Sequence, residues 1–138
     1  MNSVSATTRK LLAVLLCALL AFTTIGVTAF AKGSAGEHTR SGYTYIDENG
    51  QLKTLPNSAV TIDVTSTLTT WNQNNAWYIV DGSITISDHV YAEGTVNLLL
   101  LDGAVLTVNN QLSIGSSNTL RIYAQSTGDG VGKMRVYG

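Results

Sequence analysis

Three aspartates could carry chemistry in this chain, and each is followed directly by a glycine: Asp81, Asp102 and Asp129. Carboxylates repeated along a β-structure could chelate calcium or act as an acid–base pair on a polysaccharide. The sequence argues against both roles. No acid recurs one coil away at a strand position, where a catalytic pair must sit, and the glycine-aspartate nonapeptide that winds around calcium is absent. Asp-Gly is also a common turn sequence. We therefore predict turns here, and no catalytic, metal or cofactor site.

A glycine-rich segment and two histidines also carry no predicted chemistry. Residues 126–134, STGDGVGKM, have the composition of a phosphate-binding loop, but the motif needs glycine at Thr127 and a hydroxyl residue at Met134. We predict a flexible turn instead. His38 and His89 lie near no cluster at ligand spacing, so His38 is predicted to lie in a spacer and His89 to face solvent.

Aromatic residues form the most informative set: Trp71, Trp77, Tyr91 and Tyr123. Aromatic faces on a flat sheet can stack on sugar rings, and the amides of WNQNNAWY could bond sugar hydroxyls. These four residues are therefore the candidate glycan-binding residues. The alternative is that Trp71 and Trp77 close the N-terminal end of a solenoid, which must hide its core and strand edges.

The first 31 residues are predicted to be a secretory signal peptide. Arg9 and Lys10 precede an apolar stretch, and Ala29 and Ala31 have the small-residue spacing of a cleavage site. The apolar stretch is too short for a membrane span of about 20 residues. We expect cleavage after Ala31 and a secreted or cell-surface location, with no stable membrane span in the remaining 107 residues (138 − 31).

The chain beyond the leader has no cysteine and an acidic balance. Cys17, the only cysteine, lies within the leader, so no disulfide is predicted. From Lys32 onward, three lysines and three arginines stand against nine acids, a net charge of −3 (6 − 9). The basic residues are scattered. Nucleic acid and anionic membrane are therefore poor candidates as partners, because both require basic patches.

The rest of the chain is predicted to be all-β, after a small polar spacer at 32–42. Residues 43–76 are predicted to form a hairpin and a capping strand. The hairpin turns at Asn49-Gly50, a dipeptide that tolerates positive φ. Residues 59–71 alternate β-branched apolar and polar residues, which predicts one strand with one buried face.

Residues 77–138 carry short strands and turns at a recurring offset. The two dipeptides Asp81-Gly82 and Asp102-Gly103 are 21 positions apart, and TVNLLL and TLRIYA begin 24 apart. LSI at 112–114 and MRV at 134–136 differ by 22. Such a period predicts a short solenoid, a parallel β-helix of about 2.5 coils. The alternative is an antiparallel β-sandwich.

The run of four leucines at 98–101 is too short to cross a bilayer. In a coil, alternate residues point inward, so two of the leucines are predicted to fill the central stack. The other two are predicted to face outward and to be covered by the cap or by a neighbouring segment.

The segment 77–138 also matches a known pattern of the form W-Y-x-V-x-G-x-x-T-I-S-x-x-V, then G-x-V-x-L-x-L-x-D-G, then L-T-I-Y-G-Q. It resembles the β-helical repeat segment of secreted cell-surface proteins of gut Gram-positive bacteria, which are sometimes labelled as carbohydrate-binding domain proteins. The resemblance implies a right-handed parallel β-helix within a large surface protein, and it brings no catalytic residues. Such proteins run on through further coils, so we expect a truncated β-helix. The pattern is carried by Trp77, Tyr78, Val80, Gly82, Thr85, Ile86, Ser87, Val90, Gly94, Val96, Leu98, Leu100, Asp102, Gly103, Leu120, Ile122, Tyr123 and Gln125.

These patterns favour a non-catalytic structural or adhesion module, the N-terminal part of a larger surface protein. The alternative is a carbohydrate-binding module, and the second alternative is the remnant of a β-helical polysaccharide lyase or hydrolase. Expected partners are a glycan or a component of the cell wall or host surface. The last strand, in GKMRVYG, leaves an open C-terminal coil that is expected to fray or to self-associate.

Overall fold

The computed structural model describes residues 37–38 and 42–138. The predicted signal peptide with Ala29 and Ala31, and most of the predicted spacer, lie outside these residues. The described part is all-β. It contains no helix long and apolar enough to cross a membrane.

Short strands form four sheets. Sheet A contains, in spatial order, β1 (Glu37–His38), β4 (Thr61–Asp63), β6 (Trp77–Val80), β9 (Thr95–Leu100) and β12 (Thr119–Ala124). Sheet D contains β13 (Lys133–Val136), β10 (Val105–Val108) and β7 (Ser83–Ile86). Sheet C contains β11 (Leu112–Ile114), β8 (Val90–Ala92) and β5 (Thr70–Trp71), and sheet B is the pair β2 (Thr44–Ile46) and β3 (Leu52–Thr54).

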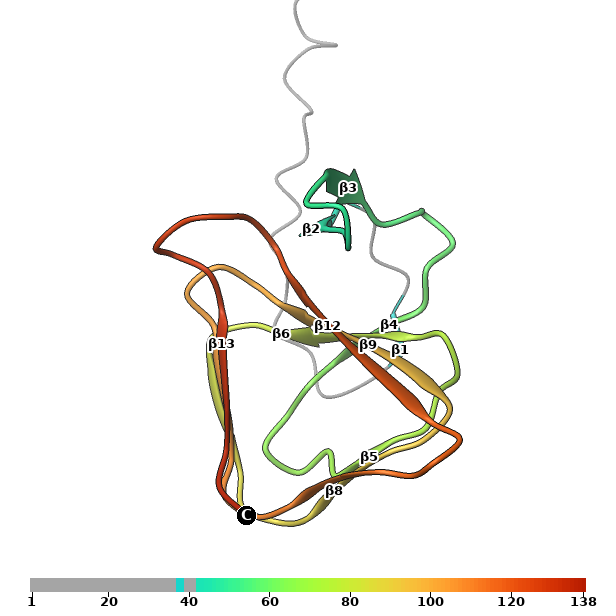
Figure 1. The fold of residues 1–138 in the computed structure, drawn as a ribbon, viewed down its shortest axis with the longest axis vertical. Helices are drawn as coiled ribbons and strands as arrows, with labels where there is room; N and C mark the ends of the chain where they lie inside the picture. Colours follow the sequence, from blue (N-terminus) through green and yellow to red (C-terminus); the bar gives the residue numbers. More distant parts are fainter. Residues whose placement is uncertain (1–36, 39–41) are drawn as a thin grey trace, which may run out of the picture. The chain divides into compact units, whose positions relative to one another are not determined.

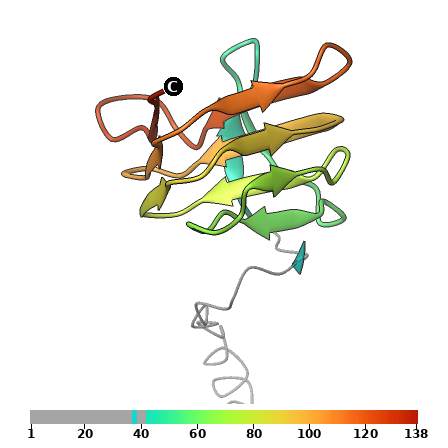
Figure 2. The same ribbon diagram turned by 90° about the horizontal axis from the view of Figure 1, so that it is seen from below.

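The chain visits sheets A, D and C in rotation, through β6, β7 and β8, then β9, β10 and β11, then β12 and β13. Figure 1 shows the three sides, and Figure 2 shows successive passes lying in layers. Short strands in parallel sheets are compatible with the predicted β-helix. Among the described residues, the antiparallel pairing that a sandwich requires is confined to β1 with β4 and β2 with β3.

The pairing register accounts for part of the recurring offset in the sequence. Thr95 pairs with Thr119, as the match of TVNLLL with TLRIYA predicts, at an offset of 24 (119 − 95). Ile84 pairs with Leu106 at an offset of 22 (106 − 84). Side chains at the same position of successive layers therefore lie in columns.

The predicted match of residues 112–114 with 134–136 is wrong. Residues 134–136 belong to β13, which pairs with β10, whereas 112–114 form β11, which pairs with β8. The cause is the segment 125–132 between β12 and β13, which is longer than the corresponding corner between β9 and β10. The offset on this side therefore grows to 28, from Val105 to Lys133 (133 − 105).

The stretch 59–71 forms two strands rather than the predicted single strand. The chain turns after β4, where the Leu68 N–H donates to the Thr65 carbonyl at 3.2 Å. The short polar residues of this segment suit a turn. Because β4 pairs in parallel with β6, and β5 with β8, the parallel layers begin at Thr61 rather than at the predicted boundary of Trp77.

The leucine run divides between two buried clusters, as predicted. Leu98 and Leu100 belong to the interior cluster enclosed by sheets A, C and D. Leu99 points the other way, into a second cluster with Ile79 and with Leu55, the residue that follows β3. Full burial of such a side chain stabilises the fold by roughly 1.5–3 kcal/mol. Sheet A is thus buried on both of its faces beneath the hairpin.

The hairpin turns as predicted at Asn49-Gly50. Gly50 has a φ of 75°, which glycine adopts without strain. The Asp47 carboxylate accepts hydrogen bonds from the N–H groups of Asn49 at 2.9 Å and Gln51 at 2.8 Å. The Gly50 N–H donates to the Asp47 carbonyl at 2.9 Å. These bonds pair the backbone N–H groups of the turn. The two strands of the hairpin, β2 and β3, lie over sheet A (Figure 1).

Candidate binding surfaces

Trp71 is part of the interior and presents no face to a ligand. Its exposed fraction is 0%. Its indole N–H donates to the Leu68 carbonyl at 3.2 Å, and its ring lies 5.7 Å from that of Tyr78. Trp71 therefore packs in the core of the first layer, which is consistent with the alternative in which it closes the N-terminal end of the stack. It is unsuitable for stacking on a sugar.

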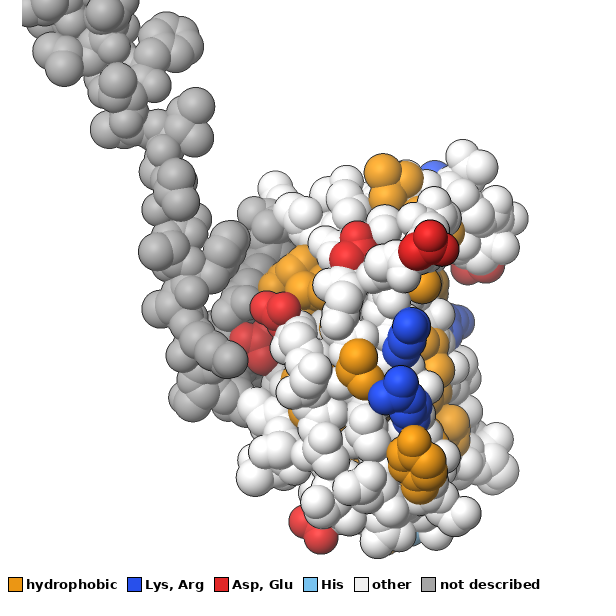
Figure 3. All heavy atoms as spheres, turned by 90° about the vertical axis from the view of Figure 1, so that its left-hand side faces the viewer, with side chains coloured by type: hydrophobic (Ala, Val, Ile, Leu, Met, Phe, Trp, Pro, Cys, Tyr) orange, Lys and Arg blue, Asp and Glu red, His pale blue; other side chains and the backbone are white. Residues whose placement is uncertain are grey.

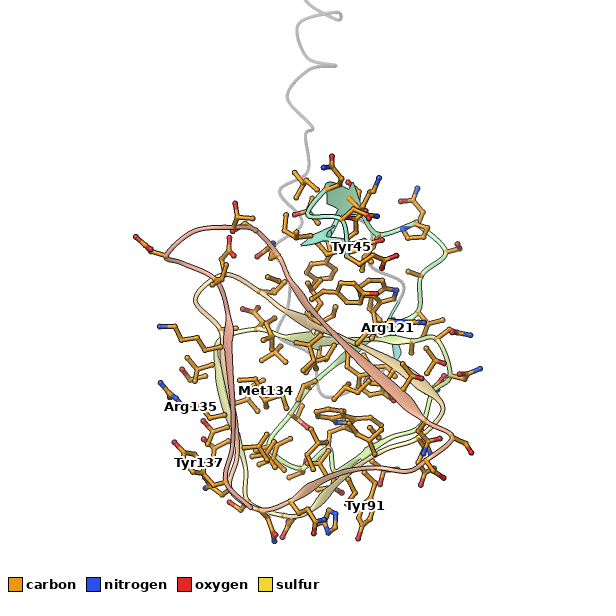
Figure 4. The ribbon with its side chains drawn as sticks, in the orientation of Figure 1. Tyr45, Tyr91, Arg121, Met134, Arg135 and Tyr137 are labelled. Atoms are coloured by element: carbon orange, nitrogen blue, oxygen red, sulfur yellow. The ribbon has the colours of Figure 1, made fainter. Side chains whose placement is uncertain are left out.

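Trp77 and Tyr123 lie together on the outer face of sheet A. Their ring centroids are 4.9 Å apart, and both rings contact Tyr45 of the hairpin, at 4.7 Å from Trp77 and 5.2 Å from Tyr123. Figure 4 shows Tyr45 pointing from β2 toward sheet A. Burial raises the pKa of Tyr123, and the charge of Arg121 opposes that rise. We call Tyr45, Trp77 and Tyr123 the aromatic cluster. It attaches the hairpin, and Trp77 does not close an end.

Of the four candidate aromatics, Tyr91 has its ring exposed, whereas Trp71 is buried and Trp77 and Tyr123 are half-buried. Tyr91 lies on the outer face of sheet C with an exposed fraction of 46% (Figure 4). The His89 ring stacks on it at 4.1 Å and 13°. His89 is held in turn by Ser113 of the next layer, with 2.7 Å between Nε2 and Oγ. His89 is thus half-buried in a stack, rather than simply solvent-facing as predicted.

Asp81 and Asp102 lie in turns, as the Asp-Gly sequences predict. Gly82 and Gly103 have φ values of 78° and 75°, a region that side chains other than glycine rarely occupy. The Ser126 hydroxyl donates to the carboxylate of Asp102 at 2.8 Å, which ties two layers together. Within the described residues, no group of three or more acidic, histidine or cysteine side chains could hold a metal ion.

The glycine-rich segment 126–134 connects β12 to β13 and packs against the preceding layer. Its Gly130 carbonyl accepts a hydrogen bond from the Gly103 N–H at 2.7 Å. A Cβ placed on Gly132 would lie 2.6 Å from the Leu101 carbonyl oxygen. The segment therefore includes a close backbone contact, which the motif comparison alone did not predict.

The last layer exposes apolar side chains on the inward side of its strands. Ile122 pairs in register with Leu98, yet their exposed fractions are 51% and 0%. Val136 pairs with Val108, and here the fractions are 45% and 0%. We call this surface the open edge. Its members are Leu120, Ile122, Met134 and Val136 of the last layer, together with Ile114 of β11, the terminal strand of sheet C.

Basic side chains flank the open edge. Arg121, Lys133 and Arg135 alternate with the inward residues of β12 and β13, so they point outward. Figure 4 shows Arg135 pointing away from the stack. Figure 3 shows basic side chains grouped on the face formed by sheet D. The preceding layers, residues 61–114, contain five acids and no lysine or arginine. Charge is therefore distributed unevenly along the stack.

The chain was compared with protein-family models, with curated proteins and with solved structures, and none of the three comparisons found a match.

Proposed function

We propose that this chain is a non-catalytic structural or adhesion module of a secreted cell-surface protein, built as a right-handed parallel β-helix. The observation that carries the proposal is the in-register rotation of strands through sheets A, D and C, with aliphatic columns inside. A stack of this kind is rigid, because each layer satisfies the backbone hydrogen bonds of the next. The family resemblance of residues 77–138 and the leader-like N-terminus support the same conclusion.

Cysteine pairs test the layered arrangement. In a chain with Cys17 replaced by serine, Thr85→Cys with Thr107→Cys places the thiols on adjacent layers in register. We expect a disulfide, because neighbouring strands are about 4.8 Å apart. Thr85→Cys with Arg135→Cys is the matched control, since these residues are two layers, or roughly 9.6 Å, apart. Equal cross-linking of both pairs would contradict the proposed stack.

Secretion is tested separately. N-terminal sequencing of material released by the producing cell is expected to begin at Lys32. Retention in the cytosol with Met1 intact would contradict the proposed location without affecting the β-helix.

A carbohydrate-binding role is the second candidate, and Tyr91 is the observation that favours it. Its ring is exposed on a flat sheet and is backed by His89, which limits its motion and leaves less entropy to lose on binding. On a glycan array, Tyr91→Ala is expected to abolish binding, whereas Tyr137→Ala, also exposed, is expected to retain it. If no glycan on the array is bound, only the structural role remains. Turnover of a pectin-like polymer would contradict both the structural role and the carbohydrate-binding role.

A further inference from the structure

We propose that the Asp81-Gly82 turn is a site of spontaneous isoaspartate formation, and that the corresponding turn at Asp102-Gly103 is protected from the same reaction by its hydrogen bonds. The inference goes beyond the proposed function, because it assigns a covalent modification to one position of the fold. It depends on the geometry of the two turns and not on secretion, adhesion or glycan binding.

The reaction joins an aspartate side chain to the backbone nitrogen of the next residue. The Gly82 nitrogen attacks Cγ of Asp81, the N–Cγ bond forms, and one side-chain oxygen leaves as water with the protons of the nitrogen and the carboxyl group. The five-membered ring then takes up water. Opening at Cγ restores aspartate, whereas opening at the former backbone carbonyl gives isoaspartate, in which the chain runs through Cβ and Cγ. Glycine favours ring closure because it has no side chain to obstruct the nitrogen.

The turn at Asp81 leaves the reacting groups without partners. Asp81 and Gly82 are both exposed. Within the described residues, neither the Asp81 carboxylate nor the N–H groups of Asp81 and Gly82 form a hydrogen bond to another protein group. The turn is held through the Gly82 carbonyl, which accepts from the Val105 N–H at 2.9 Å. The Gly82 nitrogen can therefore approach Cγ of Asp81 without losing a protein hydrogen bond of its own.

The turn at Asp102 engages the same three groups. The Ser126 hydroxyl lies 2.8 Å from both carboxylate oxygens of Asp102. The Asp102 N–H donates to Oε1 of Gln125 at 2.9 Å. The Gly103 N–H donates to the Gly130 carbonyl at 2.7 Å. Ring closure here must break the hydrogen bonds of both the attacking nitrogen and the carboxylate, so the folded state opposes it.

The difference between the turns arises from the length of the next corner in the stack. The segment 125–132 supplies all three partners of the Asp102 turn, and Figure 1 shows it as the loop between β12 and β13. The corner that follows the Asp81 turn in the stack, residues 101–104 between β9 and β10, is shorter and supplies none. Gly82 and Gly103 have nearly the same φ, 78° and 75°, so the two turns differ chiefly in their hydrogen bonds.

Isoaspartate at residue 81 lengthens the backbone between β6 and β7 by one carbon atom. Among the described residues, β7 pairs with β10 alone, and the bond from the Val105 N–H to the Gly82 carbonyl lies at the start of that pairing. The longer connection displaces this carbonyl. Hydrogen exchange should therefore accelerate in β7 as the modification accumulates, and remain slow in β9.

The test incubates the purified full chain at neutral pH and measures isoaspartate at each dipeptide by peptide mapping with mass spectrometry. We expect isoaspartate to accumulate several-fold faster at residue 81 than at residue 102. Asp129-Gly130, whose carboxylate and Gly130 N–H also have no hydrogen-bond partner within the described residues, is expected to react as Asp81 does. In concentrated urea, where the native hydrogen bonds are lost, residues 81 and 102 should react at similar rates. Equal rates in the folded chain, or the same preference for residue 81 in urea, would overturn the proposal.

Two variants identify the cause. Gln125→Ala with Ser126→Ala removes two of the three hydrogen bonds of the Asp102 turn, and it should raise the rate at residue 102 several-fold while leaving residue 81 unchanged. An unchanged rate at residue 102 would contradict protection by these bonds. Asp81→Glu keeps the carboxylate but requires a less favourable six-membered ring, so residue 81 should stay unmodified and β7 should keep its slow exchange. Faster exchange in β7 of the aged Asp81→Glu chain would contradict the proposed consequence. These outcomes leave the tests of layering, secretion and glycan binding unaffected.

Discussion

Leu98 and Leu99 are consecutive residues of β9, and their side chains belong to two different buried clusters. Leu98 packs in the interior, and Leu99 packs beneath the hairpin with Leu55 and Ile79. Neither side chain has measurable exposure. A strand alternates its faces, so one leucine stabilises the stacked layers and the other holds the hairpin onto them.

Replacing each leucine with alanine is expected to separate these two roles. Both Leu98→Ala and Leu99→Ala should lower the free energy of unfolding by about 2–5 kcal/mol, measured by urea denaturation. Hydrogen exchange should then differ: Leu99→Ala accelerates exchange in β2 and β3, and Leu98→Ala accelerates it in β6, β9 and β12. Leu52→Ala, at an exposed hairpin position, should change stability by less than about 0.5 kcal/mol. Unchanged protection of the hairpin in Leu99→Ala would contradict the assignment.

Gly132 is expected to tolerate no side chain. A Cβ at this position would lie 2.6 Å from both the Leu100 Cβ and the Leu101 carbonyl oxygen, so the loop or the preceding layer must move. Gly132→Ala should lower the free energy of unfolding by about 1–3 kcal/mol. Gly130→Ala is the matched control, because its Cβ would meet nothing within 4 Å. Equal stability of the two variants, measured by urea denaturation, would show that the close contact is absent in solution.

Tyr78 is expected to make the fold sensitive to alkaline pH. Burial raises its pKa above the ordinary value of 10.0, and the hydrogen bond that its hydroxyl accepts from the Gln73 N–H opposes this rise. A pKa that is higher in the folded state contributes stability that is fully present below the unfolded value and is lost as pH rises through the folded value.

The measurement is the free energy of unfolding between about pH 8 and pH 11. It should fall with pH more steeply in the wild-type chain than in Tyr78→Phe. Part of the fall should remain, because burial also raises the pKa of Tyr123. Parallel curves for the wild type and Tyr78→Phe would contradict a buried, neutral Tyr78 hydroxyl.

Local patterns in the sequence predicted the features that depend on neighbouring residues. The alternation of a strand placed Leu98 and Leu99 on opposite faces, and the backbone freedom of Gly50 located the hairpin turn. The turn within 59–71 was missed, because threonine is common in both strands and turns and the alternation continued through it.

The candidate surfaces depended on contacts between distant residues and could be predicted only in part. Tyr45 lies 32 positions before Trp77 (77 − 45), and only the folding of the hairpin over sheet A brings their rings within 4.7 Å. The alternation of Tyr43 and Tyr45 was the available signal, but it does not say which face the hairpin covers. The bond between His89 and Ser113 likewise requires the pairing of β8 with β11, in which Tyr91 lies opposite Ser113, whereas the sequence comparison matched residues 112–114 with 134–136.

The last layer is expected to be the least stable part of the stack in the absence of a partner. Ile122 is half exposed, whereas Leu98 in the same column is buried, so removing the Ile122 side chain removes fewer contacts. Ile122→Ala should lower the free energy of unfolding by less than about 1 kcal/mol, against about 2–5 kcal/mol for Leu98→Ala. Urea denaturation measures the two changes in the free energy of unfolding.

In the wild-type monomer, amides of β12 and β13 should exchange faster than those of β9 and β10, because the terminal strands open without disturbing the others. Hydrogen exchange with mass spectrometry at several protein concentrations measures the protection of each strand. Uniform protection through Val136 in a strictly monomeric sample would contradict the open edge, because an uncovered terminal layer cannot resist exchange as firmly as a layer enclosed on both sides.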